Sequence, residues 1–291
     1  MRVSLAVVAT LCLSMSTAHA DDALDSQVRA AMSGPIQGGV WFGAPGASIY
    51  ELGASQPLPT ASVIKAAILV ELFAAHAGHL DDPLGTDAVV ADDAHAAMTP
   101  FSDAQRKDIR AALTGVTTRT IGAIMMGSHK ASNHVYNAAA NLAIASLGGP
   151  VELTKKIGAR DPRFASIVVG RYMLAPRKPT DNLATPASLA AVLSSIATAN
   201  IPNVDGDTAA AMTRVMLQSK DALGVRYHKD GNLDSDPIVV VKTGFYLRTG
   251  KPPLVYVVAA AMTAKPTGTR DAETHRLDKL TDAVVALLTK P

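Results

Sequence analysis

The sequence is poor in cysteine and in aromatic residues. Its only cysteine is Cys12, and Phe, Trp and Tyr together make up 4% of the chain. Because no cysteine follows position 12, disulfide bonds cannot stabilise the rest of the chain. Hydrophobic residues make up 48% of the sequence, so the core must be built mainly from Ala, Val, Leu, Ile and Met.

The chain also lacks a charge imbalance and the motifs of several enzyme classes. Its 27 basic and 25 acidic residues give a net charge of +2, which offers no electrostatic basis for binding nucleic acid or an anionic membrane. There is no G-x-S-x-G, H-E-x-x-H, C-x-x-C, P-loop or G-x-G-x-x-G motif. The eight histidines show no metal-ligand spacing. We therefore expect neither a metal nor a cofactor.

The first 20 residues have the three parts of a secretory signal peptide. A basic start precedes an apolar run over 3–13, and residues 18–20 read Ala-His-Ala, a typical cleavage site. The run is too short to span a bilayer, and the bulky Leu11 before Cys12 argues against a lipid anchor. We expect a periplasmic or secreted protein that begins at Asp21 and has no membrane attachment after cleavage.

A serine and a lysine lie three residues apart at the start of an apolar stretch. Pro59 indicates a helix start, and the run over 66–73 contains no helix breaker, which predicts a buried helix. Ser62 and Lys65 would then share one face, one turn apart. A lysine can accept a serine proton only if burial or a second cation favours its neutral form. Because S-x-x-K occurs by chance about once in a chain this long, the pair needs further support.

Lys242-Thr243-Gly244 could provide the second cation. The sequence from 237 to 246 predicts a strand, which would bring an ammonium group, a hydroxyl and an accessible backbone to the Ser62 helix. The alternative is an ordinary strand end followed by a turn. K-T-G arises by chance in roughly one chain in twenty, and here it follows S-x-x-K. We expect the Lys242 amine to lie across a cleft from Ser62 and Lys65.

The remaining segments predict one sheet assembled from both ends of the chain. Strands are expected over 38–44, 47–52, 237–246 and 254–262, and helices over 103–113, 117–126, 137–147, 187–197, 207–217 and 270–288. The expected fold is α/β with an antiparallel sheet flanked by helices and an inserted all-helical lobe. Residues 21–58 and 188–291 form the α/β lobe, residues 59–187 form the helical lobe, and the mature chain contains no transmembrane segment.

These motifs, in this order, resemble the penicillin-recognising serine hydrolases, and in particular the class A β-lactamases. The resemblance covers most of the mature chain and implies a β-lactamase/transpeptidase-like fold with the site between two lobes. It implies that Ser62 is acylated and that Lys65, helped by Lys242, takes or relays its proton. It also implies a monomer with a small-molecule or peptide substrate, either a β-lactam or a D-Ala-D-Ala-like peptide.

The resemblance also assigns substrate-binding residues. It implies that Lys242 and Thr243 bind the substrate carboxylate, with Gly244 keeping the strand approachable. The N–H groups of Ser62 and Phe245 would form the oxyanion hole. Because only residues 247–253 separate the last two predicted strands, we expect the sheet to be one strand shorter than in the family.

The family's second motif, S-x-N, is not clearly present. Counting from Arg119 gives Ser128, whereas counting back from Gly148 gives Val135-Tyr136-Asn137. Ser128 and Ser132 are therefore both candidates to pass a proton to the leaving group. Asn133 or Asn137 could supply the amide that holds a substrate carbonyl. His129 and His134 are alternatives, although a polar residue at a helix start is more often a capping or solvated one.

The largest departure from the family is in the loop between the lobes. The family's β-lactamases carry Arg-x-Glu there, and the Glu activates the water that cleaves the acyl-enzyme. Here the match is Arg171-Tyr172-Met173, and we expect Asp181 to pair with Arg171 and close the loop. Methionine cannot act as a base, so deacylation of a β-lactam adduct should be slow.

Three functions fit these observations. The first is a secreted serine amidohydrolase of the β-lactamase type that hydrolyses or binds β-lactams. The second is a D-alanyl-D-alanine peptidase or small esterase, since those relatives also lack the loop Glu. The third is a non-turnover protein that becomes acylated and so senses or traps β-lactams. The lifetime of an adduct on Ser62 distinguishes the first function from the other two.

Overall fold

A computed structural model describes residues 22–177 and 179–290 of the chain. The predicted signal peptide, Cys12 and the expected start at Asp21 lie outside the described residues. Within the described part, no helix is long and apolar enough to cross a membrane.

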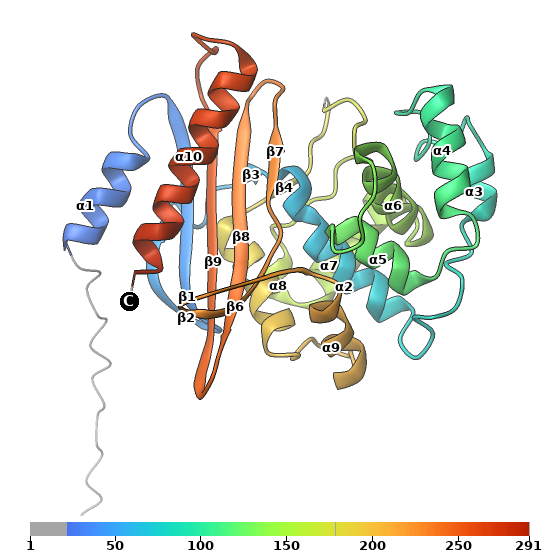
Figure 1. Cartoon of the computed structure of the whole chain (residues 1–291), viewed down its shortest axis with the longest axis horizontal. Coiled ribbons are helices and arrows are strands. Elements are labelled where there is room, and N and C mark those ends of the chain that lie inside the picture. Colours follow the sequence, from blue (N-terminus) through green and yellow to red (C-terminus); the bar gives the residue numbers. More distant parts are fainter. Residues whose placement is uncertain (1–21, 178, 291) are drawn as a thin grey trace, which may run out of the picture.

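Segments from both ends of the chain form a single antiparallel sheet, as expected (Figure 1). The strand order is β2-β1-β9-β8-β6-β5, and β7 continues along the edge of β8 where β6 ends. The strands are β1 (Ile36–Ala44), β2 (Ala47–Leu52), β5 (Leu217–Asp221), β6 (Gly224–His228), β7 (Gly231–Leu233), β8 (Val239–Arg248) and β9 (Lys251–Met262). A separate pair joins β3 (Leu58–Pro59) to β4 (Leu183–Ala184).

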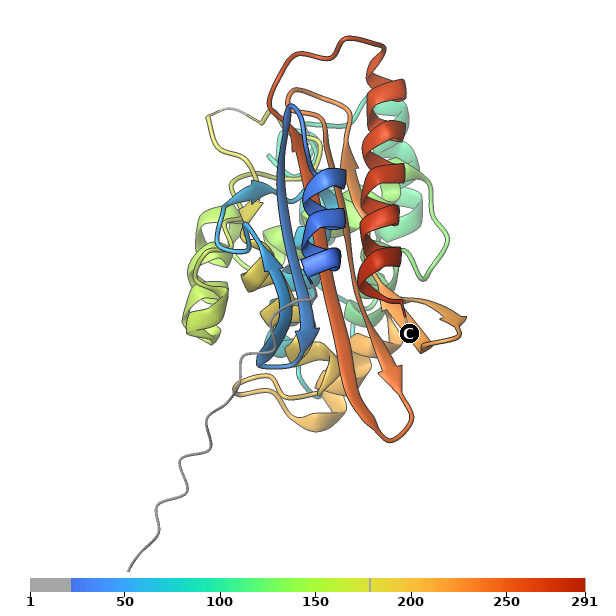
Figure 2. The same ribbon diagram turned by 90° about the vertical axis from the view of Figure 1, so that its left-hand side faces the viewer.

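Helices cover both faces of this sheet. On one face, α1 (Asp22–Ala31) and α10 (Arg270–Leu288) lie side by side (Figure 2). Val28 and Leu277 from these helices are buried with Val240 and Val258 of the sheet. On the other face, α8 (Pro186–Ala197) packs against β9 and β1. Side chains of successive strand residues therefore enter two different cores, because they point alternately to the two faces.

The helical lobe is built around α2 (Lys65–Ala75). Its other helices are α3 (Asp87–Ala91), α4 (Asp103–Leu113), α5 (Thr118–Met126), α6 (Asn133–Ser146) and α7 (Gly149–Arg160), and α9 (Gly206–Arg214) packs against α2 from the later part of the chain. Nine residues of α2 are buried, including Glu71. The Glu71 carboxylate accepts two hydrogen bonds from Arg160, at 2.6 and 2.9 Å, which compensates its burial.

The predicted fold class is confirmed, and α4 and α10 have the predicted bounds. Two helix boundaries differ by three residues or more. The helix expected from 137 begins at Asn133, and the helix expected to reach Leu217 ends at Arg214, where Leu217 starts β5.

The expectation of a shortened sheet is wrong, because β5, β6 and β7 lie between α9 and β8. Every residue of β6 is partly exposed, and these strands lack the alternation of apolar and polar residues that would have predicted them. The missing strands therefore precede the predicted K-T-G strand in the sequence.

Candidate active site

Ser62 lies in a tight turn that leads into the central helix of the helical lobe. The turn is a 3₁₀ helix, Ala61–Ile64, and Ala61 has a left-handed φ of 48°. A non-glycine residue in this conformation is strained, which is frequent at functional sites. Ser62 lines a cavity of about 700 Å³, and its hydroxyl has no hydrogen-bond partner among the described residues. The hydroxyl is therefore free to meet a ligand.

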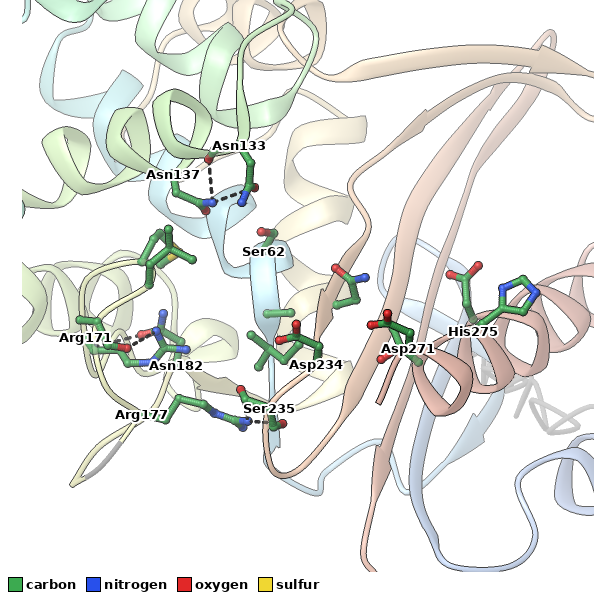
Figure 3. Close-up of a pocket in the computed structure, with 18 residues that line it drawn as sticks. Ser62, Asn133, Asn137, Arg171, Arg177, Asn182, Asp234, Ser235, Asp271 and His275 are labelled. Atoms are coloured by element: carbon green, nitrogen blue, oxygen red, sulfur yellow. Dashed lines mark hydrogen bonds between the residues drawn. The ribbon is translucent and has the colours of Figure 1, made fainter. Parts of the chain in front are cut away.

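The cavity lies between the two lobes (Figure 3). Asn133 and Asn137 of α6 lie on one side of Ser62, while Asp271 and His275 of α10 lie on another. The other lining residues come from the turn that holds Ser62, from the loop between the lobes, from β7 and the turn after it, and from α10: Ala61, Arg171, Met173, Leu174, Ala175, Arg177, Asn182, Asn232, Leu233, Asp234, Ser235, Thr274 and Asp278.

Lys65 is the first residue of α2 and is fully buried. Its Nζ donates a hydrogen bond to Oδ1 of Asn137 at 3.0 Å. Burial lowers the pKa of the Lys65 amine well below its ordinary value, and the nearby charge of Lys229 lowers it further. No direct hydrogen bond joins Lys65 to the Ser62 hydroxyl, a contact that commonly forms only when substrate binds. Lys65 thus has the environment of a base.

The second cation is Lys229, and the prediction that Lys242 provides it is wrong. Lys229 lies at the junction of β6 and β7, and only 5% of it is exposed. Its Nζ is 5.3 Å from the centroid of the Tyr136 ring, and the Nζ of Lys65 is 3.2 Å from the same centroid. Lys229-Asp230-Gly231 is the sequence pattern that could have identified this position, since it is a K-x-G with Asp in place of Thr.

Lys242 faces the other side of the sheet. Val241 and Phe245 belong to the core on the side of the helical lobe. Because side chains alternate along a strand, Lys242 points to the opposite face, which α10 covers. The Nζ of Lys242 lies 2.7 Å from Asp278, 3.2 Å from Asp282 and 3.8 Å from Asp230. Burial lowers the pKa of this amine, but the three carboxylates outweigh burial and raise it.

The neighbours of Lys242 are interior sheet residues and do not line the cavity. Thr243 Oγ1 donates to the carbonyl of Lys229, and Gly244 leaves no room for a side chain beside Tyr227 and Tyr256. Phe245 is fully buried and stacks on Tyr227 with ring centroids 5.2 Å apart. The expectation that Thr243, Gly244 and Phe245 face the substrate is therefore wrong, because β8 is covered along its edge by β6 and β7.

Gly231 brings the β7 backbone against the turn that holds Ser62. A Cβ at this position would lie 2.6 Å from the amide nitrogen of Ser62 and 3.2 Å from its Cα. Only glycine allows this approach without displacing one of the two backbones. Asn232 and Leu233, which follow, line the cavity.

Of the second-motif candidates, the structure brings Asn137 to Lys65. The Nδ2 of Asn137 donates to the carbonyl and side-chain oxygens of Asn133 at 2.9 and 3.1 Å, which turns its Oδ1 toward Lys65. Ser128 instead donates to the carbonyl of Val215 at 2.7 Å. Neither Ser128 nor Ser132 is among the residues that line the cavity.

The alternative histidine, His134, lies beside these serines and α4. Its Nε2 is 3.1 Å from Ser132 Oγ and 3.3 Å from Asp108. One ring nitrogen thus serves both partners, which differs from a catalytic triad, where the two ring nitrogens bind different groups.

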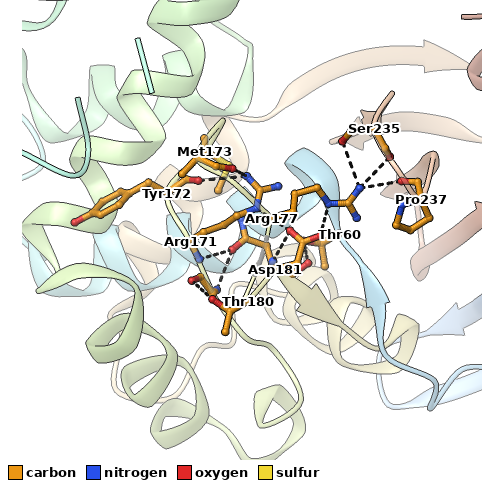
Figure 4. A network of polar contacts seen from close by, with 12 residues as sticks. Thr60, Arg171, Tyr172, Met173, Arg177, Thr180, Asp181, Ser235 and Pro237 are labelled. Carbon is orange, nitrogen blue, oxygen red and sulfur yellow. Dashed lines mark hydrogen bonds and ion pairs between the residues drawn. The ribbon is translucent and has the colours of Figure 1, made fainter. Parts of the chain in front are cut away.

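The loop between the lobes is closed by the predicted ion pair (Figure 4). Asp181 accepts from Arg171 Nε at 2.8 Å and from Arg177 Nε at 2.6 Å. Burial raises the pKa of the Asp181 carboxyl, but the two arginines outweigh burial and lower it. Arg177 also donates to the carbonyls of Ser235 and Pro237, at 3.0 and 2.9 Å, so it ties the loop to the turn between β7 and β8.

Known structures share this fold. The chain matches the TLA-1 extended-spectrum β-lactamase with a TM-score of 0.69 over 93% of its length and 100% of that chain, at 12% identity. It matches a β-lactamase from Desulfarculus baarsii at 0.64, 18% identity and 93% and 98% coverage, and one from Sphaerobacter thermophilus at 0.64, 17% identity and 92% and 97% coverage. No protein-family model and no curated protein matches the sequence. The fold is that of class A β-lactamases.

Proposed function

We propose that this protein is an active-site serine hydrolase that forms an acyl-enzyme on Ser62 with β-lactams or related amides. The observation that carries the proposal is the setting of Lys65. Its amine is fully buried one helical turn from a free hydroxyl and has no carboxylate partner among the described residues. Such an amine is neutral at a pH where an exposed lysine is charged, so it can accept the serine proton.

The acylation step follows from this arrangement. Ser62 Oγ attacks the amide carbonyl carbon and its proton passes to Lys65 Nζ, which forms a tetrahedral oxyanion. The C–N bond then breaks, the leaving nitrogen takes a proton from the Lys65 ammonium, and an ester on Ser62 remains. Because Gly231 holds β7 against Ser62, the Ser62 N–H and the adjacent β7 backbone are the proposed donors to the oxyanion.

Met173 favours a long-lived β-lactam adduct over rapid turnover. It lines the cavity where the family's β-lactamases carry the deacylating Glu, and its thioether cannot activate water. A binding or sensing protein is therefore the second candidate, and a D-alanyl-D-alanine peptidase or esterase would use the same acylation step. The signal peptide predicted from residues 1–20 supports the proposal that the protein acts outside the cytoplasm on a small-molecule or peptide substrate.

The test is to incubate the purified protein with a penicillin and follow its intact mass. We expect an adduct of one penicillin that persists for hours, maps to Ser62 and is absent from Ser62→Ala. Rapid appearance and loss of the adduct would instead indicate efficient β-lactam hydrolysis. A D-Ala-D-Ala peptide assay then distinguishes a peptidase from a sensor. Absence of any Ser62-dependent adduct removes the β-lactam function.

A further inference from the structure

Tyr136 of α6 is the residue that the two buried lysines share. The Nζ atoms of Lys65 and Lys229 both lie over its ring, at 3.2 and 5.3 Å from the centroid. Tyr136 immediately precedes Asn137, which binds Lys65, and it does not line the cavity. Its ring is partly exposed and lies against both amines.

Neither lysine has a carboxylate within ion-pair distance in the part of the chain that the structure describes. Lys65 is bonded to an amide oxygen and Lys229 Nζ to the carbonyl of Asp230. Two ammonium groups without a counter-ion repel each other, so one positive charge fits this space more easily than two. Lys65 is the more deeply buried of the two amines, at 0% exposure against 5%.

The ring acts on these amines in two opposing ways. Its face attracts a cation, which favours charged lysine. Its bulk also keeps water away from the amines, which favours neutral lysine. The attraction of a ring for a cation is smaller than the cost of removing an ammonium group from water, so exclusion of water is the stronger effect.

We propose that Tyr136 is a positioning residue for acylation, whose ring shields the amines of Lys65 and Lys229 from water so that Lys65 is free to accept the Ser62 proton. The inference rests on the proposed acyl-enzyme chemistry and adds to it the residue that keeps the base in its active form. Tyr136 acts through the two lysines.

Three substitutions separate the properties of this ring. Tyr136→Phe keeps the ring and removes the hydroxyl. Tyr136→Leu keeps an apolar group that excludes water and removes the aromatic face. Tyr136→Ala opens space for water beside both amines. If Tyr136→Ala does not fold, Tyr136→Gln serves in its place, because it brings a polar group to the same position.

The probe is a fluorophosphonate, which reports activation of Ser62 without needing β-lactam recognition. The Ser62 oxygen bonds to phosphorus, the P–F bond breaks, fluoride leaves and the serine proton passes to Lys65. The second-order labelling rate is measured from pH 5 to 10, with Ser62→Ala as the blank. On the acid side of the plot of labelling rate against pH, we expect the midpoints for Tyr136→Phe and Tyr136→Leu to stay within about half a pH unit of the wild type. For Tyr136→Ala, this midpoint should move to higher pH by about one unit or more. Its labelling rate should therefore fall roughly tenfold at pH 7 and return to the wild-type rate at alkaline pH.

A second readout does not depend on reactivity. In Ser62→Ala protein with ¹³C-labelled lysine, the Lys65 Cε signal, assigned with Lys65→Arg, should titrate at higher pH in the Tyr136→Ala background. An equal loss of labelling at every pH, or an unmoved Lys65 titration, would overturn the role of Tyr136 alone. Absence of Ser62 labelling in the wild type would refute the proposed function instead, and the NMR titration would still decide the role of Tyr136.

Discussion

The side chain of Asn141 holds the backbone of Met173 at both of its polar groups. Its Oδ1 accepts from the Met173 N–H at 2.6 Å, and its Nδ2 donates to the Met173 carbonyl at 3.2 Å. Asn141 itself is fully buried on α6. The backbone of residue 173 is therefore held in place by Asn141 at the cavity wall. The side chain at this position decides which chemistry is available there.

Met173→Glu should accelerate loss of the acyl group. A carboxylate on the backbone that Asn141 holds can activate water, and one general base is typically worth about 10²–10⁴ in rate. The half-life of the penicillin adduct on Ser62, followed by intact mass, measures the effect. Met173→Gln is the matched control, since it has similar size but accepts no proton. Equal half-lives for the Glu and Gln substitutions would show that residue 173 does not reach the ester.

Gly231→Ala should slow acylation and also lower stability. The added methyl would lie 2.6 Å from the amide nitrogen of Ser62, so the turn or β7 must move. Misplacement of a reacting group by about 1 Å can cost about 10² in rate, so the penicillin acylation rate of Gly231→Ala should fall roughly tenfold or more. Gly206→Ala is the control, because nothing lies within 4 Å of its added Cβ. An unchanged rate would show that the contact does not shape the site.

Asp278→Asn should improve recognition of carboxylate-bearing substrates. Asp278 lines the cavity, so its carboxylate opposes the approach of an anionic substrate. Lys242, which Asp278 binds at 2.7 Å, keeps Asp282 as a partner at 3.2 Å and does not line the cavity. Interactions between partly exposed charges are worth about 0.2–1 kcal/mol, so removing this negative charge should raise the acylation rate with a penicillin by about 1.4- to fivefold. The uncharged methyl ester of the same penicillin should show no gain. An equal gain for acid and ester would exclude an electrostatic origin.

Asp181→Asn should destabilise the protein at neutral pH. The substitution leaves Arg171 and Arg177 without their carboxylate, and these side chains are only 10% and 15% exposed. Breaking a buried ion pair costs about 3–5 kcal/mol, which thermal or urea unfolding at pH 7 can measure.

The pH dependence of this contribution provides a check. The Asp181 pKa is lowered in the folded protein. Its stabilising contribution is therefore complete above the unfolded carboxyl pKa of about 3.9 and is lost as pH falls through the lower folded value. The difference in stability between wild type and Asp181→Asn should shrink as the pH falls below about 3.9. A difference that stays constant down to about pH 2 would contradict the ion-pair explanation.

Local patterns in the sequence predict much of this protein. Capping residues and apolar periodicity gave α4 and α10 at their observed bounds, and S-x-x-K placed Ser62 one turn from a buried lysine. The Arg171–Asp181 pair was also predicted and is present. These features depend on residues close in sequence, or on two opposite charges in one short loop. They can therefore be predicted from neighbouring residues without knowledge of the tertiary structure.

The tertiary structure alone decided which lysine accompanies Lys65. Lys242 lies in the more recognisable motif, but the alternation of side chains along β8 turns it toward Asp278 on α10. Lys229 reaches Tyr136 because β6 and β7 both pair with β8, and β7 contacts the turn that holds Ser62. The face to which a strand residue points depends on register and strand order. Those are set by pairing between distant segments, so the K-x-G pattern, which occurs at both Lys229 and Lys242, cannot choose between the two lysines.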